Sequence, residues 1–475
     1  MCSAHSHYEN YSSPEEYFRS PSPVLIDLDI KSSAIRKTRK SEPKYTPDFL
    51  AKRPKKPLGS NANNVENLHR EPLKAHTIQP EKRRNWKPNR YRNHEIKRNL
   101  ASLGLFEERT KHCGCKTIGK GAILSIDTRH GNARSAGVET CGSVWACPVC
   151  RDKIMSERSN ELTEIGEEWK KQGGKIMLLT LTFPHGFEDK LNELLGSSDE
   201  KTGLKGALKR FRQSYHWKNM KDHIGYEADC RSLEITYGEN GFHPHIHMLI
   251  YHRKGVGKQT LEAIKDGLYQ NWRDACINSG LQKPSYEHGI DLRHSNTTDY
   301  IAKWGMVQEL ASPQAKKGKK QSLTIPEMEY QLLALPVQNE KSQHYQRLLY
   351  MYYRVMKGSK LLTWGGQKKG EPSFKKRMLG EDDKSDQEVA TIQKEELQYL
   401  WAMVEIPSSQ WQSIYWRGHT ADVKTVLERG GLSLLYKWAK IQGYDTTKWK
   451  ELPDDYYQRI ADEKGYLVHQ YQADS

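Results

Sequence analysis

Segments with the hydrophobic patterns of strands and helices follow one another in a defined order between residues 175 and 292. Short apolar runs rich in β-branched residues predict strands, and apolar residues spaced three and four apart predict helices. The expected elements are a strand at 175–183, a helix at 204–215, two strands at 226–238 and 241–252, a helix at 261–272 and a short strand near 290–292. The order βαββαβ predicts an α+β fold with a ferredoxin-like core and an antiparallel sheet, in which the first and third strands are central neighbours.

Three histidines share one face of the third expected strand. In HPHIHMLIY, His243, His245 and His247 lie two residues apart, so their side chains leave the same side of the strand. Two imidazoles at this spacing can bind one divalent metal ion without distortion of the backbone. The alternative is three satisfied or exposed histidines, but three on one face of an apolar strand favour a metal site.

The hairpin formed by the second and third strands adds a carboxylate. With a two-residue turn at 239–240, Glu234 lies opposite His245 and faces the same side. An oxygen ligand beside two imidazoles suits Mg²⁺ or Mn²⁺ better than a structural zinc ion. We expect Glu234, His245 and His247 to be ligands. Because a shift of one residue in register would turn Glu234 away, His243 is the alternative third ligand.

A tyrosine lies on the helix expected after the last strand. In SNTTDYIAKWG, Asn296, Thr297 or Thr298 can cap this helix. Tyr300 and Lys303 then share one helix face, where the lysine can lower the pKa of the phenol or hold a phosphate. A tyrosine near a lysine is also an ordinary feature of an amphipathic helix, so this pair alone does not identify a catalytic site.

Three of these segments together resemble a known nuclease family. LLTLTFPH, GFHPHIHMLI and TTDYIAKW occur in the order and approximate spacing of the three motifs of HUH endonucleases, and closely resemble the plasmid rolling-circle replication initiator (Rep) family. CGSVWACPVCRDKIMSERSNEL resembles the family's cysteine-rich lead-in, and MKGSKLLTWGGQKKGEPSFKKRMLG resembles its segment after the tyrosine helix. The resemblance covers about residues 113–390.

The resemblance implies a metal-dependent, site-specific endonuclease and strand transferase that acts on plasmid origin DNA. His245 and His247 would hold the divalent metal, and Tyr300 would be the nucleophile. Attack by Tyr300 on the polarised phosphate would leave a 5′-phosphotyrosine and a free 3′-OH primer for rolling-circle replication. Host helicase and polymerase would then be possible partners.

One position departs from the family pattern. In some relatives a glutamate four residues before the tyrosine activates the water that ends replication, but this position is Asn296 here. Asp299 and Glu309 are candidate substitutes between which the sequence does not decide.

Five cysteines lie close together before the expected nuclease core. Cys147 and Cys150 form a C-x2-C pair, Cys113 and Cys115 form a second close pair, and Cys141 is a fifth thiol nearby. A structural zinc ion needs four ligands, and two such pairs predict a zinc-ribbon-like site. The alternative is a set of buried or free cysteines, since a disulfide framework is not expected in a reducing compartment.

Charge and composition predict the remaining organisation. The chain has 75 Lys and Arg against 59 Asp and Glu, a net charge of +16, which favours a nucleic-acid partner. It has no apolar run long enough to span a membrane and no signal-peptide segment, so we expect a cytoplasmic protein without a membrane partner. The expected regions are a basic, largely disordered arm at 1–100, a cysteine-rich zinc-binding segment and helix at 101–172, the nuclease domain at 173–365, and a small, mostly helical region at 366–475.

Two other functions fit parts of this pattern. A relaxase or a transposase would use the same HUH chemistry for another purpose, but the segment after Tyr300 favours a replication initiator. A non-catalytic zinc-containing DNA-binding or RNA-binding protein would use the sheet and the basic arm for recognition alone. Covalent linkage of Tyr300 to an oligonucleotide would separate the enzymes from the binding protein.

Overall fold

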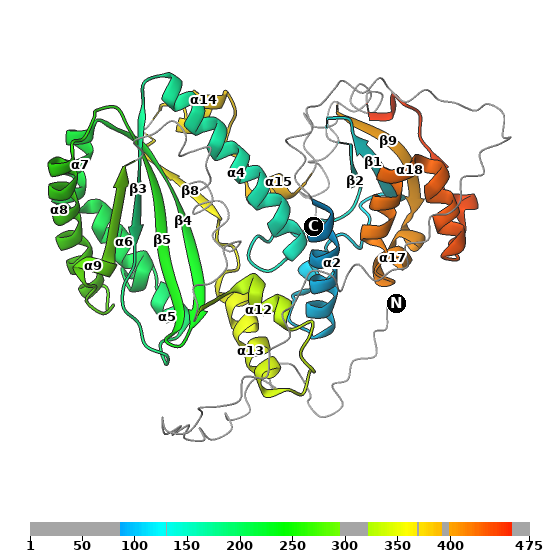
Figure 1. The fold of residues 1–475 in the computed structure, drawn as a ribbon, viewed down its shortest axis with the longest axis horizontal. Helices are drawn as coiled ribbons and strands as arrows, with labels where there is room; N and C mark the ends of the chain where they lie inside the picture. Colours follow the sequence, from blue (N-terminus) through cyan, green and yellow to red (C-terminus); the bar gives the residue numbers. More distant parts are fainter. Residues whose placement is uncertain (1–85, 130, 295–321, 368–369, 392–398, 458–475) are drawn as a thin grey trace, which may run out of the picture. The chain divides into compact units, whose positions relative to one another are not determined.

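The computed structural model describes residues 86–129, 131–294, 322–367, 370–391 and 399–457, and contains two antiparallel sheets with helices around them (Figure 1). The helices are α2 (Trp86–Ser102), α3 (Glu108–Lys111), α4 (Pro148–Lys171), α5 (Leu191–Leu195), α6 (Gly203–Gln213), α7 (Tyr215–Ile224), α8 (Lys258–Ile277), α9 (Tyr286–Gly289), α12 (Ile325–Gln331), α13 (Glu340–Val355), α14 (Phe374–Leu379), α15 (Asp386–Ala390), α17 (Ser408–Trp416) and α18 (Thr420–Ile441), with the 3-10 helix η3 at Thr446–Lys448. The strands are β1 (Gly121–Asp127), β2 (Asn132–Ala136), β3 (Lys175–Leu181), β4 (Tyr226–Gly238), β5 (Gly241–His252), β6 (Ile290–His294), β7 (Ser322–Thr324), β8 (Leu362–Gly365), β9 (Leu400–Pro407) and β10 (Lys450–Glu451). None of the described helices is both long enough and apolar enough to cross a membrane. The helices and the two antiparallel sheets confirm the predicted α+β class.

The larger sheet contains the four strands expected from the sequence. Its order is β6-β3-β5-β4-β7, and β8 pairs with another part of β4. Thr180 of β3 pairs with His247 of β5, so the first and third expected strands are central neighbours as predicted. In the β4–β5 hairpin Glu234 pairs with His245, which confirms the predicted register.

Helices α6, α7 and α8 form a layer against one face of the larger sheet (Figure 1). The ring of Phe211 in α6 contacts the rings of Trp217 in α7 and Trp272 in α8, with centroid distances of 5.3 and 5.8 Å. Arg212 of α6 approaches the sulfur of Met248, with Nη1 3.9 Å from Sδ. Because side chains alternate along a strand, this layer lies on the side of the even-numbered residues of β5.

The odd-numbered residues of β5 face a different set of elements. The ring of Tyr251 lies 4.7 Å from that of Phe374 in α14, and Phe374 lies 5.2 Å from Trp169 in α4. The three histidines of β5 share this face with Tyr251, nearer to the hairpin turn. The polar cluster therefore lies on the face opposite to α6, where no helix of that layer covers it.

The second sheet joins segments from the two ends of the described chain. Its order is β10-β9-β1-β2, and β1 pairs with β9 along its whole length. One face packs against α17 and α18 in a core that includes Leu124, Val404, Trp411 and Val423. Residues 366–475 were expected to be mostly helical, but they also supply β9, a central strand. This apolar run is short and has no clear alternation, so only its pairing with β1 identifies it as a strand.

The N-terminal arm ends earlier than expected. Residues 86–102 form α2, in which Ile96 and Leu100 are buried and pack toward α4 and α18. Basic residues surround this narrow apolar stripe, which made the helix resemble the polar arm in the sequence. Residues 1–85 lie outside the described part of the chain, so the arm expected there stays a prediction.

Candidate metal centre

Glu234, His245 and His247 converge at the middle of the β4–β5 hairpin. The Oε2 atom of Glu234 lies 2.7 Å from Nε2 of His245 and 2.7 Å from Nε2 of His247. Glu234 and His247 are buried, and His245 is partly exposed. Cross-strand pairing places Glu234 opposite His245, and the strand repeat of two places His247 next to His245. The hairpin alone therefore brings three potential ligand atoms together.

The electrostatics of this cluster favour a negatively charged glutamate. Burial raises the pKa of Glu234, but the hydrogen bonds and charges of His245 and His247 outweigh it and hold the pKa well below its ordinary range. A buried carboxylate between two imidazoles suits a divalent cation, which can replace the protons on the facing nitrogens. The donor set of one oxygen and two nitrogens can bind a divalent metal ion.

Thr180 orients the second histidine. Its hydroxyl lies 3.0 Å from Nδ1 of His247, and the strand pairing of β3 with β5 sets this contact. A partner at Nδ1 holds the ring in an orientation that directs Nε2 toward the cluster. Thr180 was not among the predicted site residues, because its position opposite His247 follows only from the pairing of two strands far apart in the sequence.

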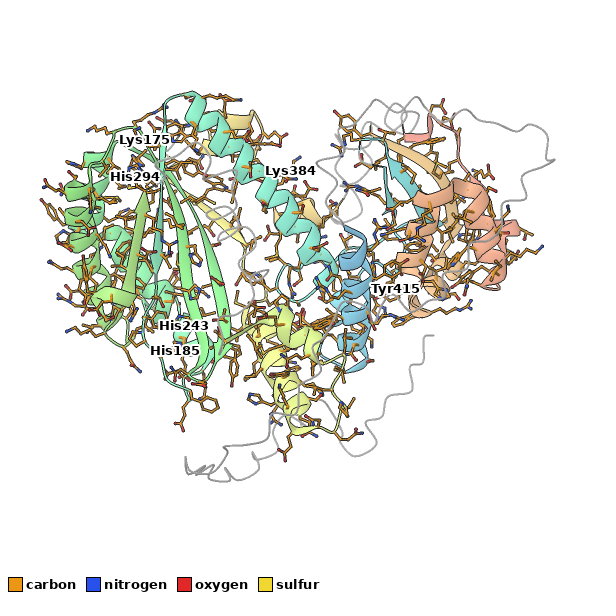
Figure 2. The ribbon with its side chains drawn as sticks, viewed as in Figure 1. Lys175, His185, His243, His294, Lys384 and Tyr415 are labelled. Carbon is orange, nitrogen blue, oxygen red and sulfur yellow. The ribbon has the colours of Figure 1, made fainter. Side chains whose placement is uncertain are left out.

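His243 belongs to a separate pair with His185, which Figure 2 labels at the hairpin end of the sheet. Nδ1 of His243 lies 2.5 Å from Nε2 of His185, and Nε2 of His243 lies 3.3 Å from the hydroxyl of Thr182. Burial and the neighbouring imidazoles of His245 and His185 lower the pKa of His243 to about 4. Both ring nitrogens of His243 have other partners, so the structure does not place this alternative ligand in the cluster.

Tyr300 and Lys303 lie outside the described residues, as do Asn296, Asp299 and Glu309. The described chain on either side of this segment belongs to the larger sheet. β6, which ends at His294, pairs with β3, and β7, which begins at Ser322, pairs with β4. Both flanking strands are therefore neighbours of strands that carry the cluster or its partner Thr180.

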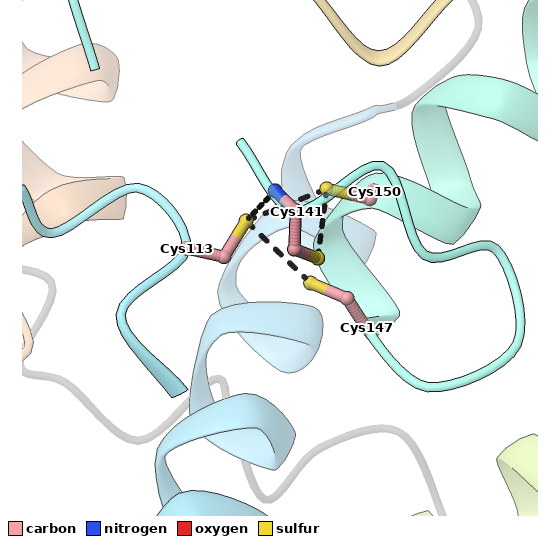
Figure 3. Close-up of side chains that lie close together, drawn as sticks. All are labelled: Cys113, Cys141, Cys147 and Cys150. Atoms are coloured by element: carbon pink, nitrogen blue, oxygen red, sulfur yellow. Dashed lines mark hydrogen bonds between the residues drawn. The ribbon is translucent and has the colours of Figure 1, made fainter. Parts of the chain in front are cut away.

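Four cysteines form a second group of potential ligands, drawn in Figure 3. The side chains of Cys113, Cys141, Cys147 and Cys150 are buried and point toward one another. Cys115 is also buried but is not part of this group, so the expected C-x-C pair does not supply two ligands. Cys113 and Cys115 lie in a turn after α3, where no regular repeat sets the direction of the side chains, so spacing in the sequence could not decide between Cys115 and Cys141.

Comparison with known proteins gives a consistent result for most of this region. A family model described as a replication protein, Rep_1, matches residues 133–404, which is more than half of the chain. The chain is 27% identical over 226 residues to "Protein rep" of Streptomyces lividans, covering 38% of this chain and 49% of that protein. It is 34% identical over 147 residues to a protein named "Neomycin resistance protein" of Streptomyces cyanogenus, covering 27% of this chain and 34% of that protein. The matched segments thus span about half and about a third of those relatives, and no solved structure matches the chain.

Proposed function

The chain belongs to the Rep_1 family of replication proteins, and we propose that it initiates plasmid replication by nicking one strand of origin DNA with Tyr300 as the nucleophile. The observation that carries this proposal is the convergence of Glu234, His245 and His247 on one face of a hairpin. In this proposal the βαββαβ core is a ferredoxin-like HUH nuclease domain. Its strand order β6-β3-β5-β4, which is the expected order of such a core, supports the interpretation.

The residues of the cluster would hold one Mg²⁺ or Mn²⁺ ion. When bound, the ion would polarise the scissile phosphate and stabilise the charge that develops on its oxygens. Glu234 supplies the negative charge that keeps the cation in a partly buried site, and the contact of Thr180 with Nδ1 would hold the His247 ring so that Nε2 faces the ion. The partial exposure of His245 leaves one side of the cluster open to a DNA strand.

The reaction would be a transesterification. The phenol oxygen of Tyr300 attacks phosphorus, the bond from phosphorus to the 3′ oxygen breaks, and the 3′ oxygen takes up a proton. Lys303, three residues after Tyr300 in the sequence, would hold the phosphate or favour the phenolate. The phosphotyrosine conserves the energy of the broken bond, so no nucleotide cofactor is required, and the 3′-OH becomes the primer for a host polymerase behind a helicase.

The first experiment measures covalent attachment. Purified full-length protein is incubated with Mn²⁺ or Mg²⁺ and with supercoiled plasmid or single-stranded origin DNA, and denatured samples are analysed for a protein–DNA adduct. We expect metal-dependent nicking and an adduct in the parent protein, and neither in Tyr300→Phe. Tyr286→Phe is the matched control, because Tyr286 is an exposed tyrosine on α9 outside the cluster.

The outcomes separate the competing functions. Nicking that persists without an adduct in Tyr300→Phe would mean that another nucleophile acts. DNA that is bound but never cut would favour the non-catalytic binding protein. Cutting of a transfer origin or a transposon end, with no cutting of a replication origin, would favour a relaxase or a transposase.

A further inference from the structure

The four clustered cysteines have the spacing of ligands around one metal ion. The Sγ atoms of Cys113 and Cys150 lie 3.4 Å apart, those of Cys141 and Cys150 3.7 Å, and those of Cys147 and Cys113 3.9 Å. A disulfide would require about 2.05 Å. Tetrahedral coordination with zinc–sulfur bonds of about 2.3 Å places neighbouring sulfurs about 3.8 Å apart. The observed separations are therefore those of a tetrahedral thiolate site rather than those of disulfides.

Backbone amides also point at the sulfurs. The amide of Cys141 donates to Sγ of Cys113 at 3.3 Å, and the amide of Ser143 donates to Sγ of Cys141 at 3.5 Å. Cys147 is the N-cap residue of α4 and Cys150 lies in its first turn, where the helix dipole favours negative charge. These contacts stabilise thiolates, which are the form that binds a metal.

A buried lysine, Lys97, lies against the cysteine group and forms no ion pair with a carboxylate of the described residues. Lys97 of α2 is 1% exposed, and its Nζ donates to the carbonyl oxygen of Cys113 at 2.5 Å and to the hydroxyl of Tyr415 in α17. Neither acceptor carries a negative charge. Lysine is almost never fully buried unless it is paired, so the compensating charge must come from another group.

The thiolates supply that charge. Four thiolates around a divalent ion carry a net charge of −2, and a lysine beside them offsets half of it. Metal-bound thiolates would therefore account for the burial of a charged Lys97, and Lys97 would offset part of their negative charge.

We propose that Cys113, Cys141, Cys147 and Cys150 bind one zinc ion, and that Lys97 and Tyr415 form its charge-compensating surroundings. The centre then links α2 at the start of the described chain and α17 near its end to the first turn of α4. Tyr415 also donates to the carbonyl oxygen of Lys111 at 3.1 Å, which connects α17 to the end of α3, just before Cys113. Zinc in this position stabilises the assembly of the second sheet with α4 and takes no part in cleavage.

The test counts zinc in full-length protein that carries His245→Ala and His247→Ala, so that the hairpin cannot contribute a zinc ion. We expect about one zinc ion per chain in this background and in its Cys115→Ser derivative, and almost none with Cys147→Ser. Cys115 is the matched control because it is equally buried but outside the group. Absence of zinc from the background protein, or equal loss from both cysteine variants, would overturn the proposal. Because no step of this test uses nicking, its result does not depend on the proposed cleavage.

Cobalt substitution covers the case in which Cys147→Ser does not fold. Protein refolded with Co²⁺ in place of zinc should show the intense visible and thiolate charge-transfer bands of tetrahedral sulfur coordination, and weak octahedral bands alone would contradict the proposal.

The role of Lys97 has its own readout. We expect Lys97→Met to weaken zinc binding about 10-fold to 100-fold in competition with a chelator, as loss of a residue that supports metal ligands does. Arg98→Met removes a positive charge from the exposed face of the same helix and should leave zinc affinity unchanged. Equal affinity in both variants would show that Lys97 does not compensate the centre.

Discussion

The hairpin cluster and the cysteine group are assembled in different ways. Glu234, His245 and His247 come from one hairpin, and their positions follow from its register and from the alternation of side chains along strands. The four cysteines lie between residues 113 and 150, and their surroundings include Lys97 and Tyr415 from segments 318 residues apart. A site built by local geometry can change with little effect on folding, whereas a site built by long-range contacts is part of folding itself.

The largest difference between the two sites should appear in stability. Cys147→Ser should lower the free energy of unfolding by about 5 kcal/mol or more, because the binding energy of a structural zinc ion is folding energy. Cys276→Ser removes an equally buried thiol from α8, outside the group, and should cost far less. Urea denaturation measures both. Similar losses in the two variants would erase the contrast between the two sites.

The next effect concerns the contact between the start of α4 and α12. Arg151 follows Cys150 and forms two hydrogen bonds of 2.7 Å to the carboxylate of Glu329, which is fully buried. Arg151→Met would leave that charge unpaired and should destabilise the protein by about 3–5 kcal/mol. The double variant with Glu329→Gln should recover much of this loss. If Arg151→Met is as stable as the parent, this pair does not contribute to the long-range assembly.

His245→Ala should affect nicking activity and leave stability unchanged. We expect nicking to fall roughly 100-fold to 1000-fold, while the urea midpoint and the zinc content of the cysteine group stay unchanged. Treatment with EDTA should likewise stop nicking, and added Mn²⁺ should restore it. A variant that nicks normally, or one that unfolds, would show that the hairpin cluster is not a separable catalytic site.

A smaller, pH-dependent effect on stability is expected at His252, the last residue of β5. Burial lowers the pKa of His252 to about 4 from an ordinary value of 6.5, and its Nδ1 donates to the carbonyl oxygen of Lys254 at 3.0 Å. The unfolded chain therefore takes up a proton before the folded chain does. Stability from this residue is complete above pH 6.5 and is lost as the pH falls toward 4. His252→Gln should flatten the difference in urea stability across this range, and an unchanged slope would contradict the assignment.

The smallest effect is expected at His243. Because its ring nitrogens contact His185 and Thr182, His243→Gln should change nicking by less than about threefold. The comparison with His245→Ala, two residues away on the same face, is the sharpest test of the ligand set. A loss as large as that of His245→Ala would make His243 a ligand.

The sequence predicted the core sheet because its information is local. Strand-like runs, the turn before Gly241 and the strand repeat of two were enough to place Glu234 opposite His245. The contact between Thr180 and His247 could not be predicted, because it depends on the pairing of β3 with β5. The second sheet was missed for the same reason, because β9 has no strand signature apart from its partner β1. Cys141 could be found only as one of five thiols, because the fold of a loop selects the fourth ligand.

The strand order of the second sheet also determines when this sheet can fold during synthesis on the ribosome. β1 is made early, but β9 follows about 270 residues later, which at roughly 5–20 residues per second corresponds to about 15–55 s. During this interval β1 has β2 on one edge and no partner on the other, and the core that later covers Ala122 and Leu124 is incomplete. The larger sheet, whose strands lie between these two segments, can form first. Completion of the second sheet therefore waits for β9, and a chain truncated before β9 would keep an open, aggregation-prone strand edge.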